Sequence, residues 1–385
     1  MKYVGYWLLL LFVAYGSAQT NHENVIFDKE KKRVLKLAND YSKLKPVTVS
    51  AFVCERSAGG KNDFYSEGDY WWPDPENPKG PYMRKDGMTN PENFTAHREA
   101  MIRFSQISGA LGSAYLITGD KKYAHYLLPH LKAWFLDEDT KMNPNLLFGQ
   151  AIMGRVTGRG IGIIDTIHLL EVAKAVMAIA DTDVLSMEEL KGIKSWFSQY
   201  LDWITTHPYG IAERDNGNNH SVCWALQVAV FAELVGNEEQ TDYAIKMYKT
   251  VLLPNQMDID GSFPLELKRT KPYGYSLFNL DVMTALCQVL SSSEENLFDY
   301  RTNDNKGILK GISFLFPYVT DKTKWPYAQD VMFWEEWPVR HPFLFFGGMA
   351  TKNEAYLVLW NNLEADFNTP EIIRNMPVRY PLLWL

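Results

Sequence analysis

Apolar residues recur at helical spacing along most of the chain, while the alternating pattern of strands is weak throughout. Short polar links at 118–120 and 235–237 join consecutive segments, which favours antiparallel neighbours. The segment from His220 is apolar on nearly every face, as is typical of an inner helix. The pattern predicts an all-α fold: a single-domain (α/α) toroid of about six to seven helical hairpins. The expected helices cover roughly 23–44, 94–118, 121–135, 161–180, 186–206, 220–235, 239–253, 275–291, 306–315 and 353–362.

One segment, 58–91, interrupts this pattern. It is rich in Gly, Pro and Trp and has no helical periodicity, so we expect a long loop there. Long ordered loops within compact domains usually carry function.

The N-terminus resembles a secretion signal. Lys2 precedes an apolar run at 6–15, which is followed by small residues ending at Ala18. This pattern predicts a signal peptide at 1–18, cleavage after Ala18 and a mature domain at 19–385 that is periplasmic or secreted. No later segment reaches the roughly 20 uninterrupted apolar residues of a transmembrane helix, so no membrane anchor is expected after cleavage.

Composition gives no sign of a disulfide framework or a metal site. Cys54, Cys223 and Cys287 are few and scattered, so at least one is unpaired and all three are interpreted as small buried apolar residues. The eight histidines form no spacing typical of metal ligands, and we expect no metal and no cofactor.

A candidate catalytic set begins at Asn218, Asn219 and His220 and continues with Arg269 and Tyr275. These residues supply amides, an imidazole, a guanidinium and a phenol. In a uronic-acid polymer the C5 proton is a poor acid, because the carbanion places its charge beside a carboxylate that is already negative. An amide and a guanidinium can neutralise that carboxylate through hydrogen bonds that strengthen in the transition state. The set therefore predicts a polysaccharide lyase acting by β-elimination.

The residues alone leave the base open. His220 or Tyr275 could remove the C5 proton. A phenol has an ordinary pKa of about 10, so Tyr275 is a base only if a cation such as Arg269 favours the phenolate. As an acid, Tyr275 could protonate the bridging oxygen at C4 without such help.

The formal net charge of -7 is unexpected for an enzyme that acts on an acidic polymer. Basic residues nevertheless flank the candidate segments, so we expect a locally positive cleft in an acidic body. The expected partner is an acidic polysaccharide, and the absence of a long basic stripe argues against nucleic acid. The flanking cations are Arg155, Arg159, Arg214, Lys268, Arg269 and Lys271.

Three further motifs, at 63–75, 142–151 and 158–165, resemble in the same order those of the alginate lyase superfamily of bacterial polysaccharide lyases. The similarity runs from about residue 57 to the last helices and is closest to polysaccharide lyase family 38, with family 5 also similar. The resemblance implies an (α/α) toroid, alginate as substrate, 4,5-unsaturated uronate products and no metal.

The resemblance also implies roles. Asn219 and Arg269 would neutralise the carboxylate, and His220 would be the base in the anti elimination expected for guluronate. Tyr275 aligns best with the family's acid, after a one-residue gap relative to family 5, although Tyr273 lies two positions earlier. For mannuronate, where elimination is syn, one tyrosine would serve as both base and acid.

Other residues are candidates for substrate contact. Arg159 is flanked by two glycines that permit close backbone approach. Asn145 equally fits an ordinary turn, and Trp72 a hydrophobic core. The full substrate-binding set is Asn218, Asn145, Gln150, Arg159, Tyr273 and Trp72.

Alternatives remain at this stage. The substrate could be glucuronan or another uronate polymer. An (α/α) glycoside hydrolase would need two carboxylates across a cleft, and the adjacent Glu335 and Glu336 point in different directions on a helix, so they suit structural roles or pairing with Arg340 better. A non-catalytic glycan-binding protein is the third class.

Overall fold

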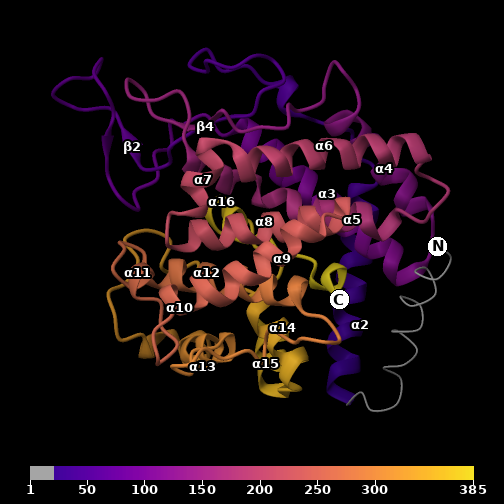
Figure 1. Cartoon of the computed structure of the whole chain (residues 1–385), viewed down its shortest axis with the longest axis vertical. Helices are drawn as coiled ribbons and strands as arrows, with labels where there is room; N and C mark the ends of the chain where they lie inside the picture. Colours follow the sequence, from indigo (N-terminus) through magenta and orange to yellow (C-terminus); the bar gives the residue numbers. More distant parts are fainter. Residues whose placement is uncertain (1–20) are drawn as a thin grey trace.

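The computed structural model of the protein describes residues 21–385 and is dominated by helices (Figure 1). The expected signal peptide lies outside these described residues. The predicted (α/α) toroid is confirmed: an inner series of helices is covered by an outer series. No helix among the described residues is both long and apolar enough to cross a bilayer.

The inner helices pack each against the next in chain order. Their residues are buried on nearly every face, which explains why their sequences lack a polar stripe. The inner series is α3 (Ala96–Thr118), α5 (Leu169–Ile179), α8 (Asn219–Val235), α12 (Pro272–Leu290) and α14 (Pro342–Thr351).

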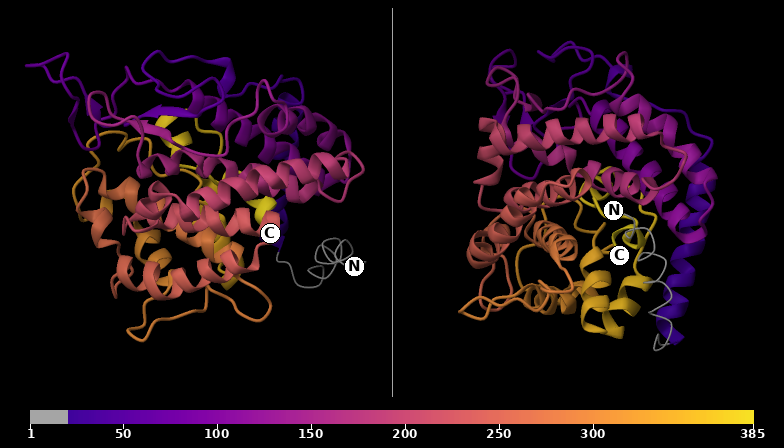
Figure 2. Two further views of the ribbon diagram at one scale, coloured as in Figure 1. Left: turned by 45° about the horizontal axis from the view of Figure 1, so that its top comes forward. Right: turned by 45° about the vertical axis from the view of Figure 1, so that its right-hand side comes forward.

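The outer helices lie on this inner series and keep a polar outer face. Helix α2 (Asn21–Tyr41) contacts both α3 and α15, so it links the first and last parts of the ring (Figure 2). The other outer helices are α4 (Lys122–Phe135), α6 (Met187–Thr206), α9 (Glu238–Met247), α13 (Ile308–Thr320) and α15 (Glu354–Asn362).

Four helices that begin with proline were not predicted. Proline is favoured in the first turn of a helix, but three of these helices are too short to show periodicity, and α14 has no polar face. The short ones are α7 (Pro208–Arg214), α11 (Pro264–Leu267) and α16 (Pro370–Arg374).

Two expected helices are interrupted. The segment Gly160–His168 is a 3-10 helix before α5, and a side chain at Gly162 would meet the backbone of Gly149 at 2.6 Å. The segment 239–253 divides into α9, a π-helical turn at Tyr248–Leu252 and α10 (Leu253–Gln256), where Pro254 cannot donate a backbone hydrogen bond. Other 3-10 turns are Val49–Ala51, Lys322–Lys324 and Pro381–Trp384.

The expected loop at 58–91 carries only short strands. Strand β1 (Tyr65–Glu67) pairs in parallel with β4 (Phe148–Ala151), and β2 (Trp71–Trp72) pairs antiparallel with β3 (Met83–Arg84). The first pairing brings two of the sequence motifs side by side at one end of the toroid.

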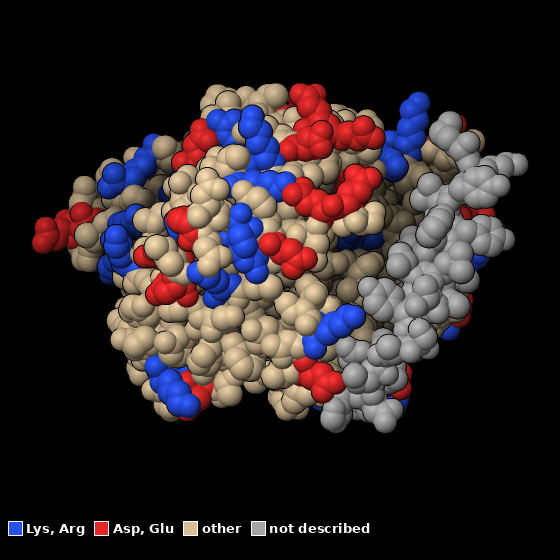
Figure 3. All heavy atoms as spheres, turned by 60° about the horizontal axis from the view of Figure 1, so that its bottom comes forward, with Lys and Arg blue, Asp and Glu red and all other residues tan. Residues whose placement is uncertain are grey.

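The cysteines are unpaired, as their spacing indicated: Cys223 and Cys287 are buried, while Cys54 is only half-buried. Charge is mixed over the outer surface. On the face in Figure 3, basic groups alternate with acidic groups and do not merge into one patch of a single sign.

Candidate active site

A cleft of about 330 Å³ lies where α8 and α12 begin. Among the elements that line it, β2, β4, α12 and α16 lie in the left half of Figure 1. Residues far apart in the sequence meet here. Of the predicted site residues, those that line the cleft are Asn218, Asn219, His220, Arg269, Tyr275, Gln150 and Arg159.

The start of α8 presents the Asn-Asn-His segment to the cleft. Asn218 is the N-cap: its side-chain Oδ1 accepts the backbone N–H of His220 at 3.0 Å. His220 therefore lies in the first helical turn, where the helix dipole favours a bound anion. Its side chain is 15% exposed, so one edge of the imidazole reaches the cleft.

Asn219 and His220 each contact a buried carboxylate. The Nδ1 atom of His220 lies 2.6 Å from Oε1 of Glu213, which is on α7. Asn219 donates its backbone N–H and its side-chain Nδ2 to the two carboxylate oxygens of Glu266 on α11, both at 2.9 Å.

Tyr275, in the first turn of α12, has its hydroxyl 2.7 Å from the hydroxyl of Tyr70. Arg269 donates to the Tyr275 hydroxyl at 3.4 Å and lies over its ring, 4.4 Å from the centroid. Burial, together with Tyr70, raises the pKa of Tyr275 well above its ordinary value, although Arg269 acts in the opposite direction. Tyr275 is therefore protonated at neutral pH, which suits a proton donor.

Arg269 is held by a carboxylate from the loop. Its Nη2 and Nε atoms donate to Asp86 at 3.1 Å and 3.3 Å. Arg84, which lines the cleft, contacts the same Asp86 carboxylate at 2.5 Å. One loop carboxylate thus positions two cleft cations.

Gln150 and Arg159 also line the cleft. Arg159 donates to the backbone oxygen and to the side-chain Oε1 of Gln150, both at 3.0 Å. Gln150 has a φ of 48°, in the left-handed region, and its N–H donates to Ser66 at 2.8 Å. These contacts hold the guanidinium of Arg159 against the cleft.

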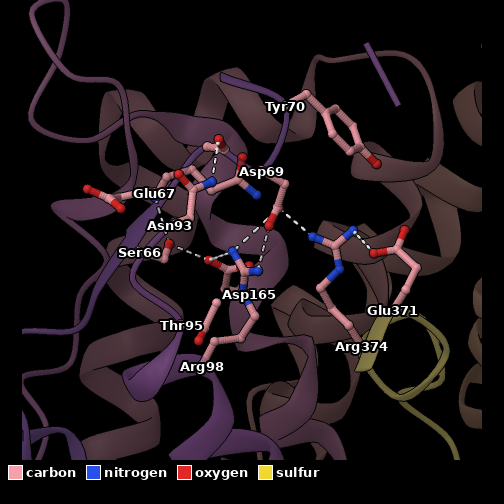
Figure 4. A network of polar contacts seen from close by, with 12 residues as sticks. Ser66, Glu67, Asp69, Tyr70, Asn93, Thr95, Arg98, Asp165, Glu371 and Arg374 are labelled. Atoms are coloured by element: carbon pink, nitrogen blue, oxygen red, sulfur yellow. Dashed lines mark hydrogen bonds and ion pairs between the residues drawn. The ribbon is translucent and has the colours of Figure 1, made fainter. Parts of the chain in front are cut away.

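A buried network of ion pairs and hydrogen bonds adjoins the cleft (Figure 4). Asp69 contacts Arg98 at 2.7 Å and also Arg374 of α16, while Arg98 contacts Asp165 at 3.1 Å. Burial alone would raise the pKa of Asp69, but Arg374 and Arg98 lower it to about 2. The two aspartates and Arg374 all line the cleft.

Three predicted substrate-binding residues lie outside the cleft lining, so their contact with substrate stays a prediction. Tyr273 is fully buried and donates its hydroxyl to the backbone oxygen of Tyr318 at 3.0 Å, because two positions along α12 turn it away from Tyr275. Trp72 donates to Met88 at 2.8 Å, and its neighbour Trp71 lines the cleft instead.

Asn145 is the third of these residues: its Oδ1 accepts the N–H of Leu147 at 3.2 Å within a turn. Of the predicted flanking cations, Arg159 and Arg269 line the cleft. Lys271 is instead buried beside Glu371 at 2.5 Å.

Several cleft residues were missed. Tyr70 and Asp69 belong to the 63–75 motif in the predicted loop. The sequence therefore indicated that this segment matters but not what these two residues do. Arg84 and Arg374 had no local signal, because each reaches the cleft only through the fold. Among the described residues, no cluster of three or more His, Cys, Asp or Glu side chains could hold a metal ion.

Comparisons with known proteins identify the relatives of this chain. The alginate lyase family model matches residues 48–325. An alginate lyase of Pseudomonas syringae pv. syringae (strain B728a) is 32% identical over 123 residues, which span 32% of this chain and 31% of that protein. The matched segment is thus about a third of the relative's length.

Two solved structures are similar along most of the chain. The crystal structure of an alginate lyase from Bacteroides ovatus is 31% identical, covers 94% of both chains and has a TM-score of 0.80. Alginate lyase A1-III of Sphingomonas species A1, as a histidine variant complexed with a tetrasaccharide, is 16% identical, covers 85% of this chain and 88% of that chain, and has a TM-score of 0.57. The chain belongs to the alginate lyase family.

Proposed function

We propose that the protein is a polysaccharide lyase that depolymerises alginate by β-elimination and leaves 4,5-unsaturated uronate ends. One observation carries this proposal: Asn219, His220, Arg269 and Tyr275, from two different helices and a loop, meet in one cleft. Family membership and the tetrasaccharide complex of a structural neighbour support a polysaccharide substrate.

The cleft suits a polyanion although the chain is acidic. Four arginines line it, and two of them, Arg84 and Arg269, share the Asp86 carboxylate. Asn219 and Arg269 neutralise the uronate carboxylate, and their hydrogen bonds strengthen as charge builds on it in the transition state.

Tyr275 acts as the acid. Its raised pKa keeps the hydroxyl protonated until the glycosidic C4–O bond breaks and the leaving oxygen takes the proton. His220 removes the C5 proton of guluronate in anti elimination. For mannuronate, Tyr275 serves as both base and acid, and Arg269 favours the phenolate that this route needs.

A hydrolase is less consistent with the site. The two aspartates that line the cleft, Asp69 and Asp165, both form ion pairs with the buried Arg98, which suits a structural role better than that of a general acid. Glu335 and Glu336 lie outside the cleft lining and contact Lys322 and Thr369.

Of the two roles expected for Glu335 and Glu336, structural or as partners of Arg340, the second was wrong, because Arg340 binds Glu30 at 2.8 Å.

We also propose a periplasmic or secreted location, supported by the N-terminal pattern of residues 1–18. Sequencing the N-terminus of the protein recovered from cell fractions tests this. A mature cytoplasmic protein that retains Met1 would contradict it.

The activity is tested with poly-mannuronate, poly-guluronate and glucuronan in separate reactions. We expect ultraviolet absorbance to rise with time on one or both alginate polymers, because each cut creates a C4–C5 double bond next to the carboxylate. A rise on glucuronan alone would assign a different uronate polymer. Shorter products with saturated ends would indicate a hydrolase, and no cutting of any of the three polymers would favour a binding protein.

A further inference from the structure

Two buried carboxylates lie directly behind neighbouring residues of the candidate site. Glu213 is 0% exposed and Glu266 is 1% exposed, and neither lines the cleft. Burying a carboxylate is costly unless it is paired or hydrogen-bonded. Here the partners are Asn219 and His220, which suggests that the two carboxylates serve the site.

Glu266 fixes the orientation of the Asn219 amide. An ionised carboxylate only accepts hydrogen bonds, so the Nδ2 of Asn219 must face Glu266. The backbone N–H of Asn219 donates to the other oxygen, which locks the residue at two points. The second N–H of the amide then remains for a substrate carboxylate.

Glu213 fixes the tautomer of His220. Its Oε1 lies 2.6 Å from Nδ1, and its Oε2 has no hydrogen-bond partner among the described residues. Because a carboxylate accepts, Nδ1 carries the hydrogen of the neutral ring, and the lone pair is on Nε2. That tautomer is the one a general base needs.

Charged and titratable groups from other parts of the chain surround both carboxylates. Arg159, Tyr200 and Cys223 face Glu213. Arg269 and His220 face Glu266, and Cys223 lies near it as well. Arg159 and Arg269 are the cations in this group.

We propose that Glu213 and Glu266 are positioning residues with different tasks. Glu266 orients the amide that neutralises the carboxylate, a step common to both epimers, whereas Glu213 orients the base that only the anti elimination of guluronate uses. This inference rests on the proposed function. In the guluronate reaction, Nε2 of His220 takes the C5 proton, and the C5–H electron pair forms the C4–C5 double bond.

The C4–O bond breaks with its electron pair in the same reaction, and Tyr275 protonates the leaving oxygen. Glu213 keeps accepting the Nδ1 hydrogen, and no oxidant or additional reactant is required. After the product leaves, His220 returns its proton to water and Tyr275 regains one.

The test compares Glu213→Gln and Glu266→Gln on poly-guluronate and poly-mannuronate. Each substitution removes the negative charge of a hydrogen-bonding partner behind the site. Loss of such a partner behind a metal-bound histidine typically costs about 10–100-fold in activity, and we expect a similar scale here. We expect Glu266→Gln to lower kcat by about 30-fold on both polymers, and Glu213→Gln to lower kcat by about 30-fold on poly-guluronate but less than about 3-fold on poly-mannuronate. KM should change little, because neither carboxylate lines the cleft.

Two further readouts separate positioning from a general structural role. The ratio of rates on the two polymers, measured on one preparation, is independent of the fraction that is folded. The control Glu30→Gln removes a buried carboxylate that binds Arg33 and Arg340, and should leave the ratio unchanged.

Nitrogen-15 spectra of the wild-type protein give an answer that does not depend on activity. We expect the neutral His220 ring to carry its hydrogen on Nδ1. A hydrogen on Nε2 would overturn the role of Glu213 even if the enzyme is an alginate lyase. If only one polymer is cleaved, the two rates cannot be compared, and the spectra then test the role of Glu213.

Equal losses on both polymers with Glu213→Gln, or unchanged kcat with Glu266→Gln, would overturn the corresponding half of the inference. Failure of the wild type to cleave either polymer would instead contradict the proposed function.

Discussion

The cleft has one side made from the starts of helices and another made from loops and the C-terminal segment. Asn219, His220 and Tyr275 lie in the first turns of α8 and α12. Tyr70 and Arg84 come from the loop that carries β2 and β3. The helix side holds the groups that would move protons, and the loop side sets the environment in which they work.

The contacts between the two sides explain this division. Tyr70 approaches Tyr275 from 205 positions away in the sequence, and Asp86 reaches Arg269 from 183 positions away. Buried helices hold groups in place with precision, whereas a loop can bring a hydroxyl or a carboxylate to them. Substitutions on the helix side should therefore abolish the chemistry, and those on the loop side should tune it.

The largest effect is expected from Tyr275→Phe, which removes the proton donor and keeps the ring. We expect kcat to fall by about 10³-fold, since a positioned acid or base contributes about 10²–10⁴-fold. The ultraviolet assay on both alginate polymers measures it. Tyr273→Phe is the matched control: it should keep turnover and lose only about 1 kcal/mol of stability from the hydrogen bond to Tyr318. The opposite result for the two tyrosines would reverse their assignment.

The second largest effect is expected from Arg269→Gln. Arg269 contacts Tyr275 on the helix side and Asp86 on the loop side. We expect kcat/KM to fall by about 10²-fold, because a donor aimed at developing charge is worth that much. Lys268→Gln makes the same change of charge at the exposed neighbouring position and should have little effect. If the two variants lost activity equally, Arg269 would act only through the overall charge of the protein.

Arg374→Gln sharpens the comparison on the loop side. Arg374 lines the cleft but contacts none of the groups proposed to transfer protons, so we expect KM to rise by about 10-fold and kcat to stay within about 3-fold. Arg340→Gln, at a buried ion pair with Glu30 away from the cleft, should leave KM unchanged. A large fall in kcat with constant KM would place Arg374 in the chemical step instead.

The two sides also differ in how far the sequence predicts them. The start of α8 was predictable because Asn218 is a strong N-cap before an apolar run, and the long helices have clear boundaries for similar reasons. Tyr275 could be chosen only by family resemblance, since Tyr273 is as close to the start of the helix. The fold separates them by the direction of their side chains.

The site residues that the sequence did not predict depend on contacts that no local pattern encodes. Glu213 and Glu266 lie on α7 and α11, short helices that begin with proline and show no periodicity. Arg374 and Tyr70 reach the cleft through the ion pairs and hydroxyl contacts of distant segments. Spacing in the sequence cannot reveal such pairs, because the path of the chain between them decides whether they meet.

The smallest expected effect tests whether Tyr70, on the loop side, changes the pKa of Tyr275 on the helix side. Burial is the main cause of the raised pKa of Tyr275, and Tyr70 raises it further. Tyr70→Phe removes the Tyr70 hydroxyl, so the pKa of Tyr275 should fall while burial keeps it above its ordinary value. An acid must be protonated to act, so the alkaline limb of kcat on poly-guluronate should move to lower pH, with kcat at neutral pH within about 3-fold of the wild type.

Tyr65→Phe is the matched control, because it removes a buried loop hydroxyl that contacts Glu67 at 2.9 Å and not the cleft. Its alkaline limb should match that of the wild type. A limb that moves to higher pH in Tyr70→Phe would mean that Tyr70 stabilises the phenolate. In that case the loop would prepare Tyr275 to act as a base, and the mannuronate reaction, where Tyr275 must lose its proton first, would be the one that Tyr70→Phe slows.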